Sequence, residues 1–179
     1  GVLVQNDIDQ EGLREAALKL LDVALADMLA TRAREGERLG VFLRERLDGI
    51  EKTVADVRGW LPHIREALRA KLQSRLGELK PAAGLAQLEP GRIEQELVLQ
   101  LSRIDVDEEL DRLSAHIAEA RRVLALPDAV GRRMDFLMQE FNREANTLGS
   151  KSVDSRTTQA SVELKVLIEQ MREQVQNIE

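Results

Sequence analysis

The sequence predicts an all-α protein, built as a long helical hairpin or coiled-coil-like arm followed by a C-terminal helical bundle. Charged residues make up 32% of the 179 residues and both signs are interleaved, which is typical of long helices. Apolar residues recur at helical spacing over most of the chain, and strand-like alternation is absent after the first few residues. With three Phe, one Trp and no Tyr, the core is expected to be aliphatic.

The arm is predicted over residues 10–80, after an opening segment, residues 1–9, that reads as the end of a linker or strand from a preceding domain. Its apolar stripe extends over about fifty residues, far beyond a usual globular helix, which indicates a coiled-coil-like arm or two abutting helices. Gly36 and Gly40 each cost about 1 kcal/mol inside a helix and predict a kink or close backbone approach. Pro62 predicts the start of a new helix, because Pro is favoured at the first helical position.

Residues 81–91 form the predicted linker, since two Pro and two Gly fall within them. Residues 92–179 are the predicted C-terminal helical domain, with helices beginning near Arg92, Asp105, Arg132 and Ser155. The arm needs a partner for its apolar stripe, and symmetric self-association is the usual solution, so a homo-oligomer is expected.

Composition excludes several classes of function. A net charge of −6 argues against a generic nucleic-acid coat, so RNA would have to bind at a local patch. The scarcity of aromatic residues argues against base stacking as the main binding mode. The absence of Cys excludes disulfides and thiolate metal sites and fits a reducing cytoplasm. No apolar run approaches the ~20 residues that cross a bilayer, so no membrane partner is expected.

The segment from Gly131 to Lys151, GRRMDFLMQEFNREANTLGSK, is the densest in interactive groups. Read as a helix, it has one narrow apolar stripe, so its other faces carry acids, amides and guanidinium groups together. Such a mixture suits a phosphate-bearing ligand. The alternative is a polar helix buried in a subunit interface.

Two groups of residues that include carboxylates suit a divalent metal. Glu140 and Glu144 form an i, i+4 like-charge pair, which costs a few tenths of a kcal/mol unless a metal or an arginine neutralises it. Upstream, one helix face is predicted to carry a second set, in which carboxylates accompany an imidazole that titrates near neutrality. This second set is Asp105, Glu109, Arg112 and His116. Salt bridges are the alternative for the first set, and helix capping by Asp105 with Glu108 is the alternative for the second.

Four basic residues of the Gly131–Lys151 segment could hold RNA phosphates. Arginine forks bind phosphate oxygens in bidentate fashion, and a helix N-terminus also favours an anion. The four residues are Arg132, Arg133, Arg143 and Lys151. Pairing of Arg132 and Arg133 with Asp128 and Asp135 is the alternative.

These segments resemble a known family, the bacterial YicC/YloC endoribonucleases. The long segment closely matches the motif G-R-[RK]-[LM]-D-F-L-x-Q-E-x-N-R-E-x-N-T-x-x-S-K, and residues 105–116 resemble D-[IV]-x-E-E-[LI]-x-R-L-x-S-H, with Ala115 in place of Ser. The terminal run VELKVLIEQMREQVQNIE also resembles the end of those proteins. The resemblance implies a cytoplasmic, metal-assisted RNA-cleaving protein that assembles as a hexamer. The family carries a further N-terminal domain, so this chain is expected to be a C-terminal piece, and whether the piece cleaves RNA alone stays open.

The function predicted from the sequence is therefore a metal-dependent endoribonuclease that hydrolyses single-stranded RNA in RNA turnover. Mn²⁺ or Mg²⁺ is the expected cofactor, with Glu109, Glu140 and Glu144 as its ligands. His116 is the candidate general acid or base beside Glu140 and Glu144, and Arg132, Arg133, Arg143 and Lys151 are the candidate RNA-binding residues. The alternative is a non-catalytic helical oligomerisation and RNA-binding adaptor for another ribonuclease.

Overall fold

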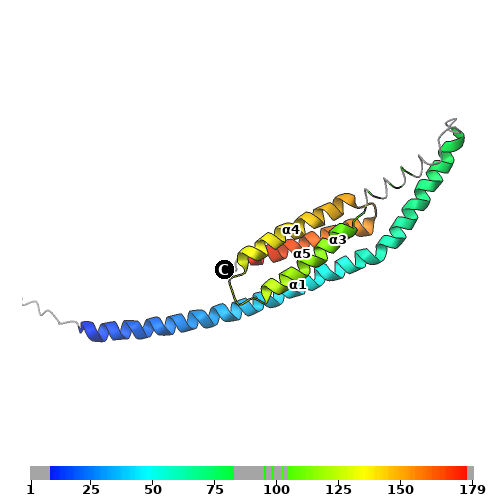
Figure 1. The fold of residues 1–179 in the computed structure, drawn as a ribbon. Helices are drawn as coiled ribbons and strands as arrows, with labels where there is room; N and C mark the ends of the chain where they lie inside the picture. Colours follow the sequence, from blue (N-terminus) through cyan, green and yellow to red (C-terminus); the bar gives the residue numbers. More distant parts are fainter. Residues whose placement is uncertain (1–8, 83–94, 96–97, 99–101, 103–104, 177–179) are drawn as a thin grey trace, which may run out of the picture. The chain divides into compact units, whose positions relative to one another are not determined.

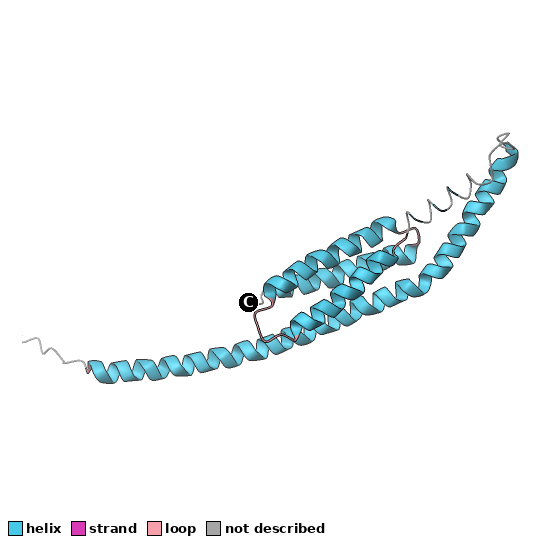
Figure 2. Ribbon diagram, in the orientation of Figure 1, coloured by secondary structure: helices cyan, strands magenta, loops and turns pink. Residues whose placement is uncertain are grey.

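The computed structural model describes residues 9–82, 95, 98, 102 and 105–176 (Figure 1). Every regular element in this part is an α-helix, which confirms the all-α prediction (Figure 2). The helices are α1 (Gln10–Ala82), α3 (Asp107–Leu124), α4 (Gly131–Lys151) and α5 (Ser155–Val175). The opening segment, most of the expected linker and the helix expected from Arg92 lie largely outside the described residues. None of the described helices is long and apolar enough to cross a membrane.

Helix α1 runs without a break for 73 residues, so the prediction that a new helix begins at Pro62 is wrong. A proline inside a helix removes one backbone hydrogen bond and costs about 3 kcal/mol. Pro62 is exposed, whereas Leu61 and Ile64 beside it are buried. Burial of the apolar side of α1 therefore outweighs the local preference of proline for a helix start.

The chain divides into two compact units, Gly1–Val41 and Phe42–Glu179. The first unit contains the start of α1, and its apolar side chains from Leu13 to Leu29 are exposed. The second unit contains the rest of α1 together with α3, α4 and α5. Residues 42–64, which the sequence assigns to the arm, therefore belong to the bundle.

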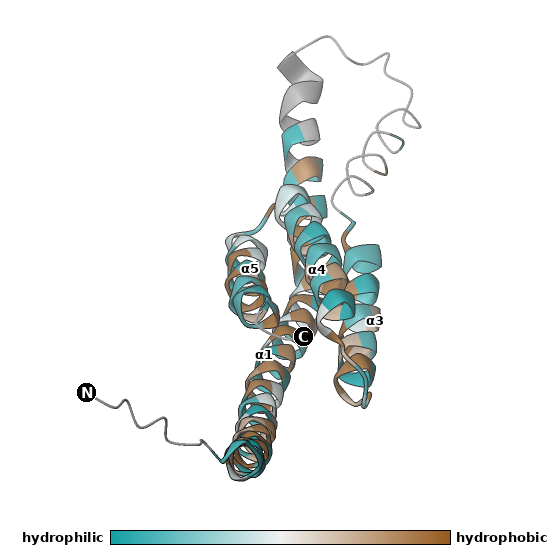
Figure 3. Ribbon diagram, turned by 90° about the vertical axis from the view of Figure 1, so that its left-hand side faces the viewer, coloured by the Kyte–Doolittle hydropathy of each residue, from teal (hydrophilic) through white to brown (hydrophobic). Residues whose placement is uncertain are grey.

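The bundle is built from four amphipathic segments that lie side by side (Figure 1). The hydropathy colouring in Figure 3 shows apolar and polar residues alternating along each of them. The core is aliphatic apart from Phe141, as predicted. Its largest fully buried side chains are Phe141, Leu43, Leu47, Ile50, Leu110, Leu113, Met134, Met138, Leu148, Leu164, Ile168 and Met171.

Ion pairs at the surface join α1 to its neighbours within the bundle. Arg121 of α3 reaches both Asp48, at 2.6 Å, and Glu51, at 2.7 Å. The hydrogen bond that Arg121 donates to Glu51 lowers the pKa of Glu51, and the hydrogen bonds that Arg121 donates to Glu51 and Asp48 raise its own pKa. All three side chains are more than a third exposed, so these ion pairs contribute little to stability. They mainly favour one alignment of α3 on α1.

Helices α4 and α5 approach closely where Gly149 faces Ser161. A Cβ atom placed on Gly149 would lie 2.9 Å from the Ser161 hydroxyl oxygen. The turn between the helices is closed by Asp154, whose carboxylate accepts the Arg156 backbone N–H at 2.9 Å and caps α5. Close packing of α4 on α5 thus accounts for the glycine at position 149.

Two phenylalanines on α4 provide a matched test of this core. Phe141→Ala is expected to lower the free energy of unfolding by about 3–5 kcal/mol, because Phe141 is fully buried and truncation leaves a cavity. Phe136→Ala on the same helix is expected to change it by less than about 0.5 kcal/mol, since Phe136 is 61% exposed. Urea unfolding followed by circular dichroism measures both, and equal losses would contradict this description of the core.

Candidate functional site

The candidate site lies along the seam where α3 and α4 pack in opposite directions. At one end Glu109 of α3 meets Lys151 of α4, and at the other end Glu119 and Arg133 line a common hollow. Both helices space their seam residues by three or four, apart from one interval of seven on α4 between Glu144 and Lys151. Such spacing keeps one stripe facing a partner helix. The seam residues are Glu109, Arg112, His116, Glu119 and Val123 on α3, and Arg133, Leu137, Glu140, Glu144 and Lys151 on α4.

At the middle of the seam the structure brings together His116, Glu140 and Glu144. Each offers one ligand atom, and these three atoms all lie within 4.8 Å of one another. Glu144 is only 2% exposed, while His116 and Glu140 are half-buried. The sequence left open whether the two predicted faces meet. Here α3 supplies the imidazole and α4 the two carboxylates.

The residues of this cluster fit a divalent cation. The Nε2 atom of His116 is buried without a hydrogen-bond partner among the described residues. Buried polar atoms are normally paired, and a ring nitrogen without a partner beside two carboxylates is a group that a cation could satisfy. Two ligands that share an ion at about 2.1 Å lie at most about 4.2 Å apart, so a small side-chain rotation would close the set.

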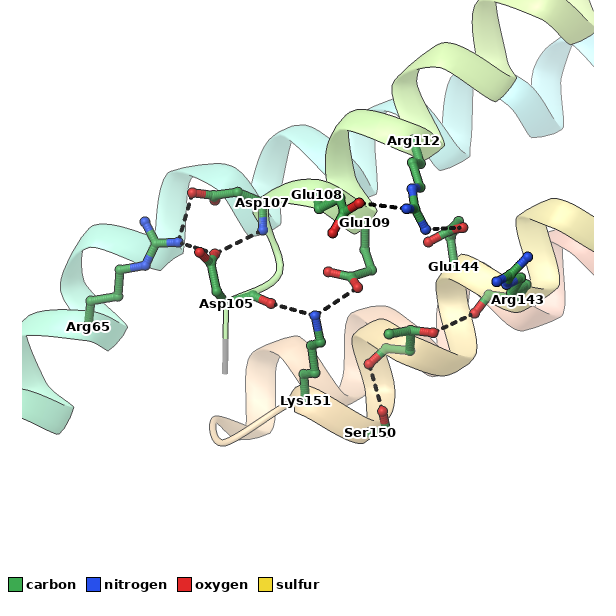
Figure 4. A network of polar contacts seen from close by, with 11 residues as sticks. Arg65, Asp105, Asp107, Glu108, Glu109, Arg112, Arg143, Glu144, Ser150 and Lys151 are labelled. Atoms are coloured by element: carbon green, nitrogen blue, oxygen red, sulfur yellow. Dashed lines mark hydrogen bonds and ion pairs between the residues drawn. The ribbon is translucent and has the colours of Figure 1, made fainter. Parts of the chain in front are cut away.

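Arginines approach both carboxylates of the cluster, but at long range. Arg112 reaches Glu144 at 3.5 Å, and Arg143 reaches Glu140 at 3.9 Å. The Arg112 guanidinium is also held by Glu108 at 2.5 Å, as Figure 4 shows. Its pKa is raised, mainly by Glu108 and next by Glu144. The two arginines therefore neutralise part of the negative charge of Glu140 and Glu144, as the salt-bridge alternative expects. They do not provide a partner for the His116 nitrogen.

The imidazole of His116 is oriented by the core. Its ring packs edge-on against Phe141, with the ring centroids 5.7 Å apart and an interplanar angle of 68°. Phe141 is fully buried, so it offers the imidazole a fixed surface. The ring is thereby held by packing rather than by a hydrogen bond to Nε2.

Glu109 and Lys151 contact each other rather than the cluster. Glu109 is 4% exposed, and its Oε1 accepts a hydrogen bond from Lys151 Nζ at 2.8 Å. The same ammonium group donates to the backbone carbonyl of Asp105 at 2.9 Å (Figure 4). The structure therefore places the expected metal ligand Glu109 in an ion pair with the expected RNA-binding residue Lys151.

Asp105 anchors the chain just before α3. Its carboxylate accepts the Asp107 backbone N–H at 3.2 Å and receives Arg65 at 2.9 Å. Arg65 also pairs with Asp107 at 2.9 Å, and its pKa is raised chiefly by that hydrogen bond. The cap position of α3 is Val106, and no side chain caps the helix there. Asp105 and Glu108 therefore do not form the capping box of the alternative interpretation, and Glu108 pairs with Arg112 instead.

The four candidate RNA-binding residues do not gather at one point. Arg132 and Arg133 are exposed in the first turn of α4, whereas Lys151 ends the helix, roughly 28 Å away at 1.5 Å per residue. Arg143 is exposed beside the cluster. They would hold successive parts of an extended chain rather than one phosphate.

Phe136 enters the site without having been assigned to it from the sequence, and Arg112, which the sequence places on one face with Glu109 and His116, takes a defined position there. Arg112 stands between the cluster and the Glu109–Lys151 pair, and Phe136 lies exposed one turn before Glu140. The alternating three- and four-residue spacing along α3 is a signal that places Arg112. Exposure of Phe136 is visible only in the folded chain.

Comparisons with known proteins agree with the motif resemblance. A family model described as "Endoribonuclease YicC-like, C-terminal" matches residues 57–179. A Haemophilus influenzae protein named "Probable endoribonuclease YicC" is 44% identical over 179 residues, which cover all of this chain and 61% of that protein. A Clostridioides difficile protein of the same name is 31% identical over 175 residues, which cover 98% of this chain and 59% of that protein. The chain thus spans about three-fifths of the length of these curated relatives.

Replacing Lys151 tests whether it stabilises the fold through Glu109. Lys151→Met is expected to lower the free energy of unfolding by about 1–3 kcal/mol, because it leaves a buried carboxylate without its partner. Combining it with Glu109→Gln is expected to restore part of the loss, since the buried charge is removed. Lys165→Met on α5, an exposed lysine, is the control, and a loss as large there would contradict the assignment.

Proposed function

Because the chain belongs to the YicC-like endoribonuclease family, we propose that it is a metal-dependent endoribonuclease that hydrolyses phosphodiester bonds in single-stranded RNA. The observation that carries the metal dependence is the cluster of His116, Glu140 and Glu144 with its orphaned imidazole nitrogen. The printed names of both relatives support cleavage of RNA. We propose that the protein acts in RNA turnover in the cytoplasm.

Glu140 and Glu144 would hold Mn²⁺ or Mg²⁺, both of which prefer carboxylate oxygen ligands. A cation at this position supplies Lewis-acid stabilisation of the charge that builds on the phosphate. Burial of Glu144 lowers the dielectric constant around its carboxylate and so strengthens its electrostatic interactions. Arg143 stands beside the cluster with its side chain largely exposed, where it can reach a phosphate oxygen.

His116 has two candidate roles that exclude each other at the same nitrogen. Nε2 either completes the ligand set or exchanges a proton with the reacting oxygen. If it is a ligand, its removal weakens metal binding. If it is the acid or base, its removal slows cleavage and leaves metal affinity unchanged.

The first unit favours a second candidate function, a helical oligomerisation and RNA-binding adaptor. Leu18, Leu21, Leu25 and Met28 follow each other at spacings of three, four and three residues, the pattern of a coiled-coil seam. All four are between 44% and 53% exposed, and such a stripe needs a partner to leave water. We propose a second copy of the chain as that partner, and the adaptor differs from the enzyme in not cutting RNA.

The cluster can be tested by metal binding as well as by activity. Glu140→Gln and Glu144→Gln are each expected to weaken Mn²⁺ binding by at least about tenfold, because even outer-shell partners of a metal contribute that much. Isothermal titration calorimetry measures the affinity, and Glu163→Gln, an exposed acid on α5, is the control. Equal affinity in wild type and both cluster variants would contradict the metal site.

Cleavage of a short, end-labelled single-stranded RNA is assayed with Mn²⁺, with Mg²⁺ and with chelator. Metal-dependent cutting that is lost in Glu140→Gln and Glu144→Gln, with folding retained, is the expected result. His116→Ala separates its two candidate roles through its effect on metal affinity. Binding of RNA without cutting would favour the adaptor instead.

Self-association is tested by a charge placed in the exposed stripe. Leu25→Glu is expected to lower the molar mass measured by light scattering towards the 20.1 kDa of one chain. Val23→Glu is the control, because residues two apart on a helix point roughly 200° apart. An unchanged mass for Leu25→Glu would contradict the proposal that this stripe joins copies.

A further inference from the structure

Phe136 is the most exposed aromatic side chain of the protein. The chain has four residues of this kind, all in the described part, and Phe136 alone among them is largely exposed, at 61%. Phe141 is fully buried, and Phe42 and Trp60 are partly buried beneath the guanidinium groups of Arg46 and Arg156. A single exposed apolar side chain is ordinary at a protein surface, so the residues that surround this ring decide what it can bind.

The ring of Phe136 lies in an open hollow of about 590 Å³ between α3 and α4 that is rich in positive charge. Arg122, Arg132 and Arg133 line this hollow with a single acid, Glu119. Glu119 is occupied by Arg122, whose hydrogen bonds to it are 2.6 and 2.7 Å long and lower its pKa. Within the described residues neither Arg132 nor Arg133 makes a hydrogen bond or an ion pair. Arg133 acts on Glu119 only at longer range, where it helps to lower the pKa of that carboxyl, so both guanidinium groups can reach an anion.

The hollow lies about one helical turn from the candidate metal cluster along both helices. Phe136 precedes Glu140 by four residues, which is about one helical turn or 5.4 Å along α4. On α3, Glu119 follows His116 by three residues, again about one turn. A chain lying along the seam would therefore pass from the arginines and Phe136 to the cluster without leaving these two helices.

A ring flanked by free guanidinium groups matches the chemistry of an unpaired nucleotide. Bases stack on aromatic faces when they are not already stacked in a duplex, and arginine forks bind the neighbouring phosphates. The scarcity of aromatic residues argues against base stacking as the main mode of RNA binding. A single exposed ring is nevertheless enough to stack with one base. The acidic balance of the whole chain, −6, makes this local excess of two positive charges stand out.

We propose that the hollow around Phe136 binds one nucleotide of single-stranded RNA next to the bond that is cut. The base stacks on Phe136, and Arg132 and Arg133 hold the adjacent phosphates. This inference rests on the proposed function and adds to it a subsite for an unpaired base. It makes the enzyme selective for single strands, because a paired base cannot reach the ring.

The test is binding of a fluorescein-labelled 12-nucleotide single-stranded RNA, measured by anisotropy in chelator so that nothing is cut. Phe136→Ala is expected to weaken binding by about 5- to 100-fold, the range for loss of one stacked base. Phe136→Trp is expected to retain wild-type affinity, because its ring also stacks. Phe136→Ala is expected to leave the affinity for a fully paired RNA duplex unchanged, and Val166→Ala, an exposed apolar residue on α5, is the control.

Salt dependence separates the two kinds of contact. Arg132→Ala/Arg133→Ala is expected to reduce the slope of log affinity against log salt by about 1.4, since each phosphate contact on a single strand contributes about 0.7. Phe136→Ala is expected to leave that slope unchanged. An unchanged slope in the double arginine variant would overturn the phosphate contacts.

The outcomes distinguish this inference from the proposed function. Unaltered RNA affinity in Phe136→Ala, with cutting by wild type intact, would overturn the subsite alone. Failure of wild type to bind single-stranded RNA at all would overturn the subsite and the proposed function together. Equal losses in Phe136→Ala and Phe136→Trp would exclude stacking. A lower molar mass in Phe136→Ala with unchanged RNA affinity would identify a protein contact and also overturn the subsite.

Discussion

The antiparallel packing of α3 against α4 is the constraint on which the position of every candidate site residue depends. Because the helices run in opposite directions, each later turn of α3 meets an earlier turn of α4. Glu109 therefore meets Lys151, Arg112 meets Glu144, and His116 lies beside Glu140. Apolar side chains on the inner faces of both helices hold this alignment, and the polar residues line its edge, where the core meets solvent.

Two buried carboxylates on this edge are compensated very differently, and the difference separates a structural position from a candidate functional one. Glu109 has a close ammonium partner at 2.8 Å. Glu144 is as deeply buried, but its guanidinium partner stands at 3.5 Å and is shared with Glu108. Burial of a charge without close compensation is unfavourable, and such positions are retained where a ligand supplies what the protein lacks. Glu140 adds a second negative charge beside Glu144, and the nearby His116 nitrogen has no hydrogen-bond partner.

Sequence periodicity predicts the helices well, because each one buries residues at three- and four-residue spacing. The proline signal fails at Pro62, where the local preference for a helix start is overridden by burial of Leu61 and Ile64 from the same turns of α1. It also assigns residues 42–64 to the arm, since a stripe on one helix does not reveal what covers it. For the site, local spacing brings Glu140 and Glu144 onto one face of α4. The pairing of Glu109 with Lys151 joins residues 42 positions apart, and only the fold reveals it.

The glycine at position 149 has a consequence for the chemistry on another side of its helix. Five residues after Glu144, it points roughly 140° away from it, towards α5 rather than α3. A Cβ atom at this position would lie 2.9 Å from the Ser161 hydroxyl oxygen and 3.4 Å from the Ser161 Cβ, so the hydroxyl would have to move, and a slide of α4 along α5 would break this close fit. A shift of one turn would carry both carboxylates about 5.4 Å past His116 and separate the three groups. The close contact at Gly149 thus favours one alignment of α4 on α5. That alignment keeps Glu140 and Glu144 of α4 level with His116 of α3.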